Sequence, residues 1–235
     1  MRIDIEQFAG RILLEDNHLL VVNKLPSELV QGDKTGDKPL VESLKQYLGH
    51  KYQKPGEVFL GVVHRIDRPT SGLVIFARTS KALTRLNEML QNREISKKYW
   101  AVVKNKPPEP EGRLEHYLRK NEKQNKSYIV DSSAPGAKRA ELHYKALGIA
   151  DNYSLLEVEL FTGRHHQIRV QLSALGCPIK GDLKYGFDRS NPDGSIHLHA
   201  REVSFAHPVK KELIRLLAPV PNEKLWRFFE SQING

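Results

Sequence analysis

The sequence predicts an α+β fold: a single domain, residues 1–235, with a mixed, largely antiparallel central sheet flanked by helices and loops. Three observations support this prediction. Short apolar segments follow one another in pairs with turn residues between them, which is typical of antiparallel strands. Amphipathic segments with helical spacing come between these pairs, without the regular strand–helix alternation of a parallel sheet. With 235 residues, 39% of them hydrophobic, the chain is long enough to build a substantial core.

The strands and helices can be assigned in chain order. Residues 12–24 predict two short strands around the turn EDNH. Apolar segments predict further strands at residues 58–67, 71–79, 97–103, 138–150, 153–163 and 195–208. Helical spacing predicts helices at residues 39–48, 80–95, 165–176 and 224–232, with Ser80 as the N-cap of the second. Turn residues predict loops at 25–39, 106–112 and 177–186, and residues 116–130 are strongly polar and basic.

The overall charge indicates a polyanionic partner. Lys and Arg number 37 against 28 Asp and Glu, which gives a net charge of +9 and a pI of about 9.5. Nucleic acid is the commonest partner of so basic a domain, and the alternative is a basic enzyme without such a partner. The one cysteine excludes an internal disulfide, the start MRIDIEQFAG lacks the layout of a secretory signal, and no apolar run approaches a membrane helix. We therefore expect a cytoplasmic protein.

Positive charge is concentrated in the middle of the chain. From Gln91 to Lys145, thirteen Lys and Arg stand against seven Asp and Glu. This excess is consistent with the solvated face of an exposed hairpin, and also with a surface that follows RNA phosphates. The positive charge of the whole chain favours the second interpretation.

Residues 62–79, VVHRIDRPTSGLVIFART, place one acid, Asp67, among two arginines and a histidine. In one interpretation Asp67 is a turn acid, bonded to nearby backbone, hydroxyl or arginine groups. In the other it is a catalytic carboxylate. Fixed positive charge would keep it ionised, which suits a nucleophile or a charge stabiliser better than a general acid. A carboxylate that attacks a sugar C1′ is familiar from retaining glycosidases, but these need a second carboxyl, and none here has a comparable setting.

Five segments of the chain, in order, match the pattern of one known family. HRIDRPTSGLVIFART is similar to its catalytic motif, His-Arg-Leu-Asp-Arg-x-Thr-Ser-Gly-Leu-Leu. The other four are its opening strand pair and loop, ILLEDNHLLVVNKLPSELV; its tyrosine segment, ISKKYWAVV; its Gly-Arg-Thr-His-Gln-Ile-Arg segment with a Gly-Asp-x-x-Tyr-Gly end, FTGRHHQIRVQLSALGCPIKGDLKYG; and its closing strand, LHAREVSFAHPV. From about Ile12 to about Pro221, the chain resembles the RluA family of RNA pseudouridine synthases.

The resemblance implies an isomerase that converts specific uridines of RNA to pseudouridine, with no cofactor and no metal. It implies that Asp67 is the catalytic aspartate, which attacks C1′ of the uridine or assists departure of the base. Tyr99 matches the tyrosine that stacks on the uracil and is a candidate for removing the C5 proton. Arg164 matches the arginine that pairs with the catalytic acid. Because the base never leaves, no second carboxyl is needed.

The resemblance also bears on RNA binding. Arg65 matches a residue that enters the gap left by the flipped base, and His166 is expected to hydrogen-bond within the site. The first family strand begins near Arg11, so we expect no N-terminal RNA-binding domain, and recognition by the basic hairpins, the loop at 26–39 and the 105–140 region. We expect a monomer that binds a stem-loop of tRNA or ribosomal RNA. The predicted RNA-contacting residues are Arg65, Arg68, Lys97, Lys98, His166 and Arg169.

The chain departs from the family pattern at three positions. Ile66 replaces the commoner Leu, which changes little. Pro69 stands where an acid is more usual, so the turn is stiffer and one polar contact is lost. His165 replaces the usual Thr or Ser, which alters the surroundings of Arg164 but leaves the arginine itself in place.

Three other functions stay open on the residues alone. An RNA-binding module with the same fold would lack the chemistry, although Asp67, Tyr99 and Arg164 are all present. A nucleoside hydrolase would need paired carboxylates or a metal-binding acid cluster, and neither is evident. His197 and His199 share one face of a predicted strand, as metal ligands would, but no cysteine cluster accompanies them.

Overall fold

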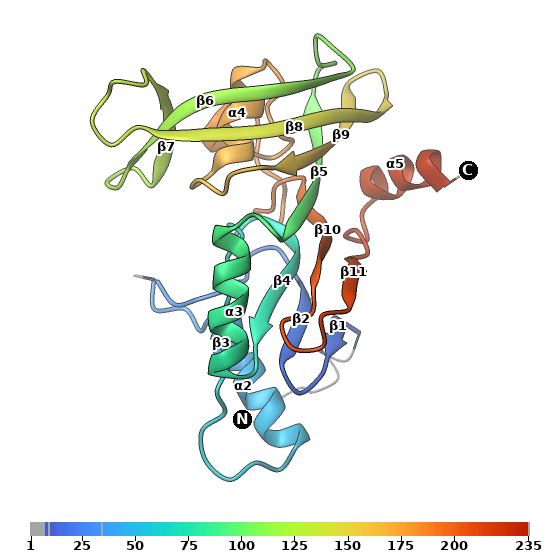
Figure 1. Cartoon of the computed structure of the whole chain (residues 1–235). Coiled ribbons are helices and arrows are strands. Elements are labelled where there is room, and N and C mark those ends of the chain that lie inside the picture. Colours follow the sequence, from blue (N-terminus) through green and yellow to red (C-terminus); the bar gives the residue numbers. More distant parts are fainter. Residues whose placement is uncertain (1–7, 9, 34, 235) are drawn as a thin grey trace. The chain divides into compact units, whose positions relative to one another are not determined.

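The computed structural model describes residues 8, 10–33 and 35–234, and the chain divides into two compact units (Figure 1). Unit 1 comprises the chain up to Ser96 together with Ala200–Pro219. Unit 2 comprises Lys97–His199 and the chain from Val220 onward. Each unit is built from two separate stretches of sequence. The first seven residues lie outside the described residues, so the prediction that the chain begins without a signal sequence falls outside them too. Lys34, in the predicted loop at 26–39, also lies outside the described residues.

Unit 1 is a sheet with helices. Its elements are β1 (Ile12–Glu15), β2 (Leu19–Lys24), α2 (Leu40–Lys51), β3 (Gly61–Val62), β4 (Ser71–Ala77), α3 (Ser80–Gln91), the larger part of β10 (Leu198–Ala206), and β11 (Leu213–Leu217). Nearly every side chain of β2 and β4 is buried, which explains their continuous apolar sequences. The two strands pair antiparallel, from Leu19 opposite Ala77 to Lys24 opposite Gly72. Helix α3 lies along β4 (Figure 1) and closes this part of the core.

Gly72, which follows Asp67 in the motif, is required by the packing of β4 beside β10. Its φ is +110°, a region that favours glycine. A Cβ atom at this position would lie 2.3 Å from the backbone oxygen of Ala200 on β10. The glycine of the motif is therefore explained by strand packing, independently of any chemistry.

Unit 2 is an antiparallel sheet with a helix on each side. Its elements are β5 (Ser96–Lys104), β6 (Glu111–Asn121), β7 (Lys126–Val130), β8 (Lys138–Ile149), β9 (Tyr153–Leu160), α4 (Gln167–Ala174), the short 3₁₀ helix η1 (Leu183–Tyr185), and α5 (Lys224–Asn234). The strand order is β5-β9-β8-β6-β7. Val170 of α4 packs with Leu118 and Ala140 on one face of the sheet (Figure 1). Trp226 and Phe229 of α5 pack in a separate cluster on the other, which includes Trp100, Val102 and Leu155.

The α+β class and the largely antiparallel sheet are confirmed. Three local expectations were wrong. The N-cap of α3 is Thr79, whose side chain accepts a hydrogen bond from the backbone N–H of Ala82, and not Ser80. The strand expected at 58–67 is only the two-residue β3, because the chain then turns toward Asp67. Strands β6, β7 and β11 were not predicted, and the loop expected at 177–186 contains η1. The single-domain assignment stays a prediction.

Cys177, the one cysteine of the sequence, is buried, and burial raises the pKa of its thiol. In the described part of the chain, no helix combines the length and apolar composition needed to cross a bilayer.

Candidate functional site

Asp67 lies in unit 1, on the loop between β3 and β4. The backbone oxygen of Asp67 accepts a hydrogen bond from the N–H of Thr70 (3.0 Å), which closes the turn. His64, at the start of the loop, accepts a hydrogen bond at Nε2 from the backbone N–H of Ile75 on β4 (3.2 Å). This contact ties the start of the loop to β4. Asp67 itself is half-buried, and Arg65 is exposed.

A buried lysine holds the same loop in place through hydrogen bonds. Lys24, at the end of β2, is 0% exposed. Its ammonium donates three hydrogen bonds to backbone oxygens: those of Leu25 (2.9 Å), Glu28 (2.9 Å) and Arg68 (3.1 Å). Burial lowers the pKa of Lys24 to about 7, while the charges of Glu28 and Asp67 act in the opposite direction. Lys24 therefore fixes the backbone of Arg68, the residue next to Asp67.

The burial of Lys24 predicts a pH-dependent stability. We expect the free energy of unfolding of the protein, minus that of a Lys24→Met variant, to rise as the pH increases from about 7 toward 10.5. In this window the unfolded chain binds more protons than the folded one, and each pH unit adds at most about 1.4 kcal/mol. Urea denaturation at several pH values measures the difference. A constant difference would show that Lys24 keeps its ordinary pKa in the folded protein.

The turn-acid interpretation of Asp67 loses two of its partners. Arg68 pairs with Asp37 (2.8 Å) and donates from Nε to the backbone oxygen of Ser27 (3.1 Å). The buried hydroxyl of Thr70 makes no hydrogen bond among the described residues. Arg68 and the Thr70 hydroxyl are therefore not the groups that would hold Asp67 as a turn acid.

Tyr99 lies in unit 2, near the start of β5, opposite Val158 of β9. Its side chain is buried, with 7% of its surface exposed. The two preceding residues are the lysines predicted to contact RNA. Lys98 pairs with Glu157 (3.0 Å), and burial lowers the pKa of Lys97.

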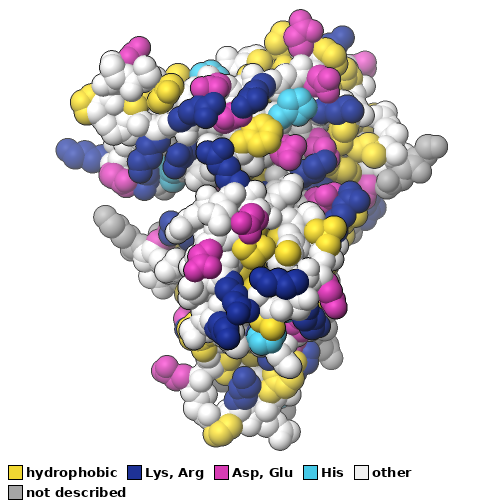
Figure 2. Space-filling view, viewed as in Figure 1, with side chains coloured by type: hydrophobic (Ala, Val, Ile, Leu, Met, Phe, Trp, Pro, Cys, Tyr) yellow, Lys and Arg dark blue, Asp and Glu magenta, His cyan; other side chains and the backbone are white. Residues whose placement is uncertain are grey.

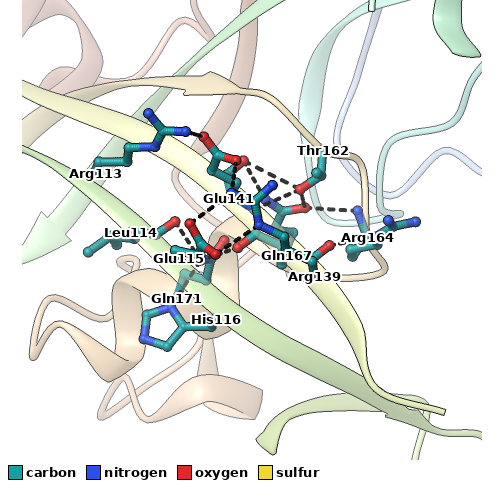
Figure 3. Close-up of polar contacts among 11 residues, drawn as sticks. Arg113, Leu114, Glu115, His116, Arg139, Glu141, Thr162, Arg164, Gln167 and Gln171 are labelled. Carbon is teal, nitrogen blue, oxygen red and sulfur yellow. Dashed lines mark hydrogen bonds and ion pairs between the residues drawn. The ribbon is translucent and has the colours of Figure 1, made fainter. Parts of the chain in front are cut away.

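Arg164 also lies in unit 2, on the loop between β9 and α4, and the buried amide of Gln167 holds this loop (Figure 3). The Oε1 atom of Gln167 accepts hydrogen bonds from the backbone N–H of Arg164 (2.9 Å) and from the hydroxyl of Thr162 (2.8 Å). Its Nε2 donates to the backbone oxygen of Glu141 (3.0 Å). The Nε of Arg164 donates to the backbone oxygen of Arg139 (2.9 Å). Because Nε is engaged, an anion would meet the two terminal nitrogens of Arg164.

Beside this loop, the buried carboxylate of Glu141 neutralises two arginines (Figure 3). Arg113 and Arg139 both pair with it. Arg139 also makes a bidentate pair with Glu115, at 2.8 Å for each bond. The basic residues on this part of the sheet are therefore matched by acids.

His166 begins α4 in a left-handed conformation, with φ of +53°, and is buried. The hydroxyl of Tyr185 accepts a hydrogen bond from the backbone N–H of Ser127 (2.8 Å) and lies 2.9 Å from Nδ1 of His166. The contact with the Tyr185 hydroxyl therefore holds the imidazole ring in place through Nδ1. Burial, followed by the charge of Arg169, lowers the pKa of His166 far below its ordinary value. His166 is a neutral hydrogen-bonding residue.

Arg169 is buried on α4 and is fully engaged. It forms a bidentate pair with the buried Asp182, at 2.7 and 2.9 Å, and its guanidinium lies 5.1 Å from the centre of the Tyr185 ring. Only 5% of its surface is exposed. This burial argues against the predicted direct contact between Arg169 and RNA and favours a structural role.

His197 and His199 are held by contacts other than metal coordination. The Nδ1 of His197 accepts a hydrogen bond from the side-chain amide of Asn191 (3.0 Å), and its Nε2 lies 3.1 Å from Glu223. The ring of His197 stacks on Trp226, with 5.3 Å between the ring centres, and the ring centre of His199 lies 5.9 Å from that of the same Trp226. Burial, followed by the charge of Lys180, lowers the pKa of His197 to about 4. Among the described residues, no three His, Cys, Asp or Glu side chains gather as metal ligands would.

The predicted site residues thus fall in both units. Asp67, Arg65 and Arg68 belong to unit 1, whereas Tyr99 and Arg164 belong to unit 2. Sequence reasoning missed Lys24 and Gln167, which hold the loops of Asp67 and Arg164. A lysine at the end of an otherwise apolar strand, LLVVNK, was the available signal for the first.

Comparisons with known proteins identify the family. The model of the RNA pseudouridylate synthase family matches residues 18–174. An uncharacterized RNA pseudouridine synthase of Synechocystis is 33% identical over 229 residues, covering 94% of this chain and 69% of the relative. The ribosomal large subunit pseudouridine synthase D of Zymomonas mobilis is 33% identical over 223 residues, covering 90% and 69%. The structure of human RNA pseudouridylate synthase domain containing 4 superposes with a TM-score of 0.79 at 24% identity, covering 98% and 95%.

The match of the family model includes the loop of Asp67, the strand of Tyr99 and the loop of Arg164. Two relatives at 33% identity extend over at least nine tenths of the chain, and the human structure shares its fold. The resemblance noted from the sequence motifs is confirmed. The chain therefore belongs to the RluA-type RNA pseudouridylate synthase family, isomerases that convert uridine in RNA to pseudouridine.

Proposed function

We propose that this chain isomerises specific uridines of structured RNA and that Asp67 is its catalytic carboxylate. The observation that carries the proposal is the loop of Asp67. The carboxylate lies on a closed turn whose next residue is fixed by the buried ammonium of Lys24, and the arginines at 65 and 68 flank it in sequence. A carboxylate held in place on such a loop can act as a nucleophile.

The proposed reaction conserves every atom of the nucleotide. The carboxylate of Asp67 attacks C1′, or stabilises positive charge there, as the C1′–N1 bond breaks. The detached uracil turns and C5 bonds to C1′, which releases the carboxylate where it had bonded to C1′. The proton on C5 is then removed while N1 gains one. Arg164 is proposed to pair with the catalytic carboxylate, as the family resemblance implies. The sum is an isomerisation that calls for no cofactor and no metal.

Tyr99 is proposed to stack on the uracil and to remove the C5 proton. We expect a Tyr99→Phe variant to retain RNA affinity, because the ring remains, and to lose roughly 10²-fold in rate, because the hydroxyl acts in proton transfer. Single-turnover rates at saturating RNA measure this effect, with affinity measured in parallel. A Phe variant as fast as the parent would show that the Tyr99 hydroxyl takes no part in catalysis. A Tyr99→Leu variant, which removes the ring, should weaken binding as well.

The substrate is proposed to be a stem-loop of ribosomal RNA or tRNA. Relatives named as ribosomal large subunit pseudouridine synthases favour ribosomal RNA. The net charge of +9 supports a polyanionic substrate. Arg65, Arg68, Lys97 and Lys98 are retained as proposed RNA contacts. We also propose that the protein acts as a monomer in the cytoplasm.

Tritium release from RNA labelled at C5 of uridine tests the proposal. Bulk tRNA and large-subunit ribosomal RNA, both made without modifications, are incubated with the protein and with its Asp67→Asn variant. Release by the parent alone supports the proposal, and the RNA that releases tritium identifies the substrate class. Tight binding of both RNAs without release would favour the alternative, an RNA-binding module that has lost the chemistry.

A further inference from the structure

The hairpin of β6 and β7 carries positive charge that no acid neutralises. Residues 119–126, RKNEKQNK, contain four basic residues and one acid. The acid, Glu122, pairs with Lys120 (2.6 Å). Among the described residues, Arg119, Lys123 and Lys126 pair with no acid. In Figure 2 dark-blue Lys and Arg side chains gather over this part of unit 2.

Several other cations of the same sheet are matched by acids: Arg113 and Arg139 by Glu141 and Glu115, and Lys98 by Glu157. Among the described residues, Lys138 and Lys145 of β8 also pair with no acid, but they lie apart in the sequence, whereas the hairpin places three such cations within eight residues. Unpaired cations repel one another, so this arrangement lowers stability unless an anion binds there.

The hairpin also exposes an aromatic ring among these cations. Tyr128 is 39% exposed and lies directly opposite Arg119 in the strand pairing. The ammonium of Lys126 lies 5.4 Å from the centre of the Tyr128 ring, and the hydroxyl donates to Gln124 (2.6 Å). An exposed aromatic ring held between cations suits the sugars, bases and phosphates of a nucleic acid better than an acidic peptide, which needs only the charges.

The hairpin is tied to the loop of Arg164. The hydroxyl of Ser127 donates to the backbone oxygen of His165 (2.7 Å), and the side-chain oxygen of Asn125 lies 3.0 Å from Nε2 of His165. Lys184 donates to the backbone oxygen of Asn125 (3.0 Å). His165, which departs from the family pattern, thus connects the hairpin to the residue beside it, Arg164. RNA bound on the hairpin would be held at a fixed distance from that arginine.

We propose that the β6–β7 hairpin, residues 119–128, is a docking surface for the RNA backbone flanking the target uridine. The inference rests on the proposed function for the identity of the RNA. The unpaired cations meet phosphates, and Tyr128 packs against a base or sugar. The tether through His165 makes the hairpin part of substrate positioning.

The test removes the three unpaired charges without changing the sheet. The triple variant Arg119→Gln, Lys123→Gln, Lys126→Gln is compared with a control, Lys54→Gln, Lys81→Gln, Lys224→Gln, which removes the same charge from exposed positions elsewhere. Both are made in the Asp67→Asn background, so that binding is measured without turnover. The probes are unmodified large-subunit ribosomal RNA, unmodified bulk tRNA and polyglutamate. Far-ultraviolet circular dichroism and urea midpoints check folding, and Tyr128→Ala is a second, single-site variant.

We expect the hairpin variant to lose on the order of tenfold to hundredfold in RNA affinity near 0.15 M salt, and the slope of log affinity against log salt to fall by about 2 to 3. In the active background, it should raise the RNA concentration for half-maximal rate more than it lowers the maximal rate. RNA affinity equal to that of the control overturns the inference, as does a loss confined to polyglutamate, or no RNA binding by the parent. Tritium release by the parent protein tests the proposed function independently of the hairpin variants.

Discussion

Replacing Asp67 by Asn is expected to reduce pseudouridine formation by at least about 10⁴-fold, the scale seen when a catalytic nucleophile is removed. The amide is close to the carboxylate in size but carries no negative charge, so it cannot attack C1′ or stabilise positive charge there. The turn should survive, because its hydrogen bond uses the backbone oxygen of Asp67 and not the side chain. Tritium release in single-turnover conditions measures the loss.

The matched control is Asp151→Asn, which removes an exposed carboxylate from the turn between β8 and β9. It should leave the rate unchanged. The urea midpoint and RNA affinity of the Asp67→Asn variant should stay close to those of the parent. If either collapsed, Asp67 would be a structural residue, and the turn-acid interpretation would return.

Replacing Arg169 by Met is expected to lower the free energy of unfolding by about 3 to 5 kcal/mol, because it leaves the carboxylate of Asp182 buried without its partner. The side chain of Asp182 is 1% exposed, so water cannot replace the lost hydrogen bonds. Urea denaturation of the variant measures the loss. The double variant Arg169→Met, Asp182→Leu removes both charges and should recover most of the stability.

This pair of variants also separates the two roles considered for Arg169. A structural role predicts that stability falls in the single variant and returns in the double variant, and that RNA affinity follows stability. A direct contact with phosphate predicts an unchanged urea midpoint, with RNA affinity lowered equally in both variants.

Much of the fold could be predicted because its signals are local. The apolar runs of β2 and β4 and the amphipathic spacing of α3 depend only on which residues neighbour one another in the chain. Strand β11 was missed because its sequence, LIRLL, is short and its exposed and half-buried positions alternate without a buried face. Thr79 and Ser80 both carry a hydroxyl suited to capping, and only the backbone geometry decides between them.

The candidate site was predictable in part, and for a different reason. Asp67, Tyr99 and Arg164 were assigned to the site through motifs, which record chemistry and not structure, and this assignment stays a prediction. Lys24 and Gln167 were missed because their roles depend on partners that are remote in sequence: Lys24 reaches the backbone of Arg68, and Gln167 reaches that of Glu141. Arg169 was assigned to RNA for the same reason, since its burial against Asp182 is not visible in a list of basic residues.

The two-part construction of unit 1 has a consequence during synthesis on the ribosome. Strands β2 and β4 are translated early, but β10, the next strand in the sheet order, and β11 come from Ala200–Pro219. All of Lys97–His199 must emerge before β10 can lie beside β4, so the part of this edge that β3 does not pair with stays open throughout that interval. The nascent chain is therefore most exposed to aggregation while unit 2 is being made, and chaperone demand should peak before residue 200 leaves the tunnel.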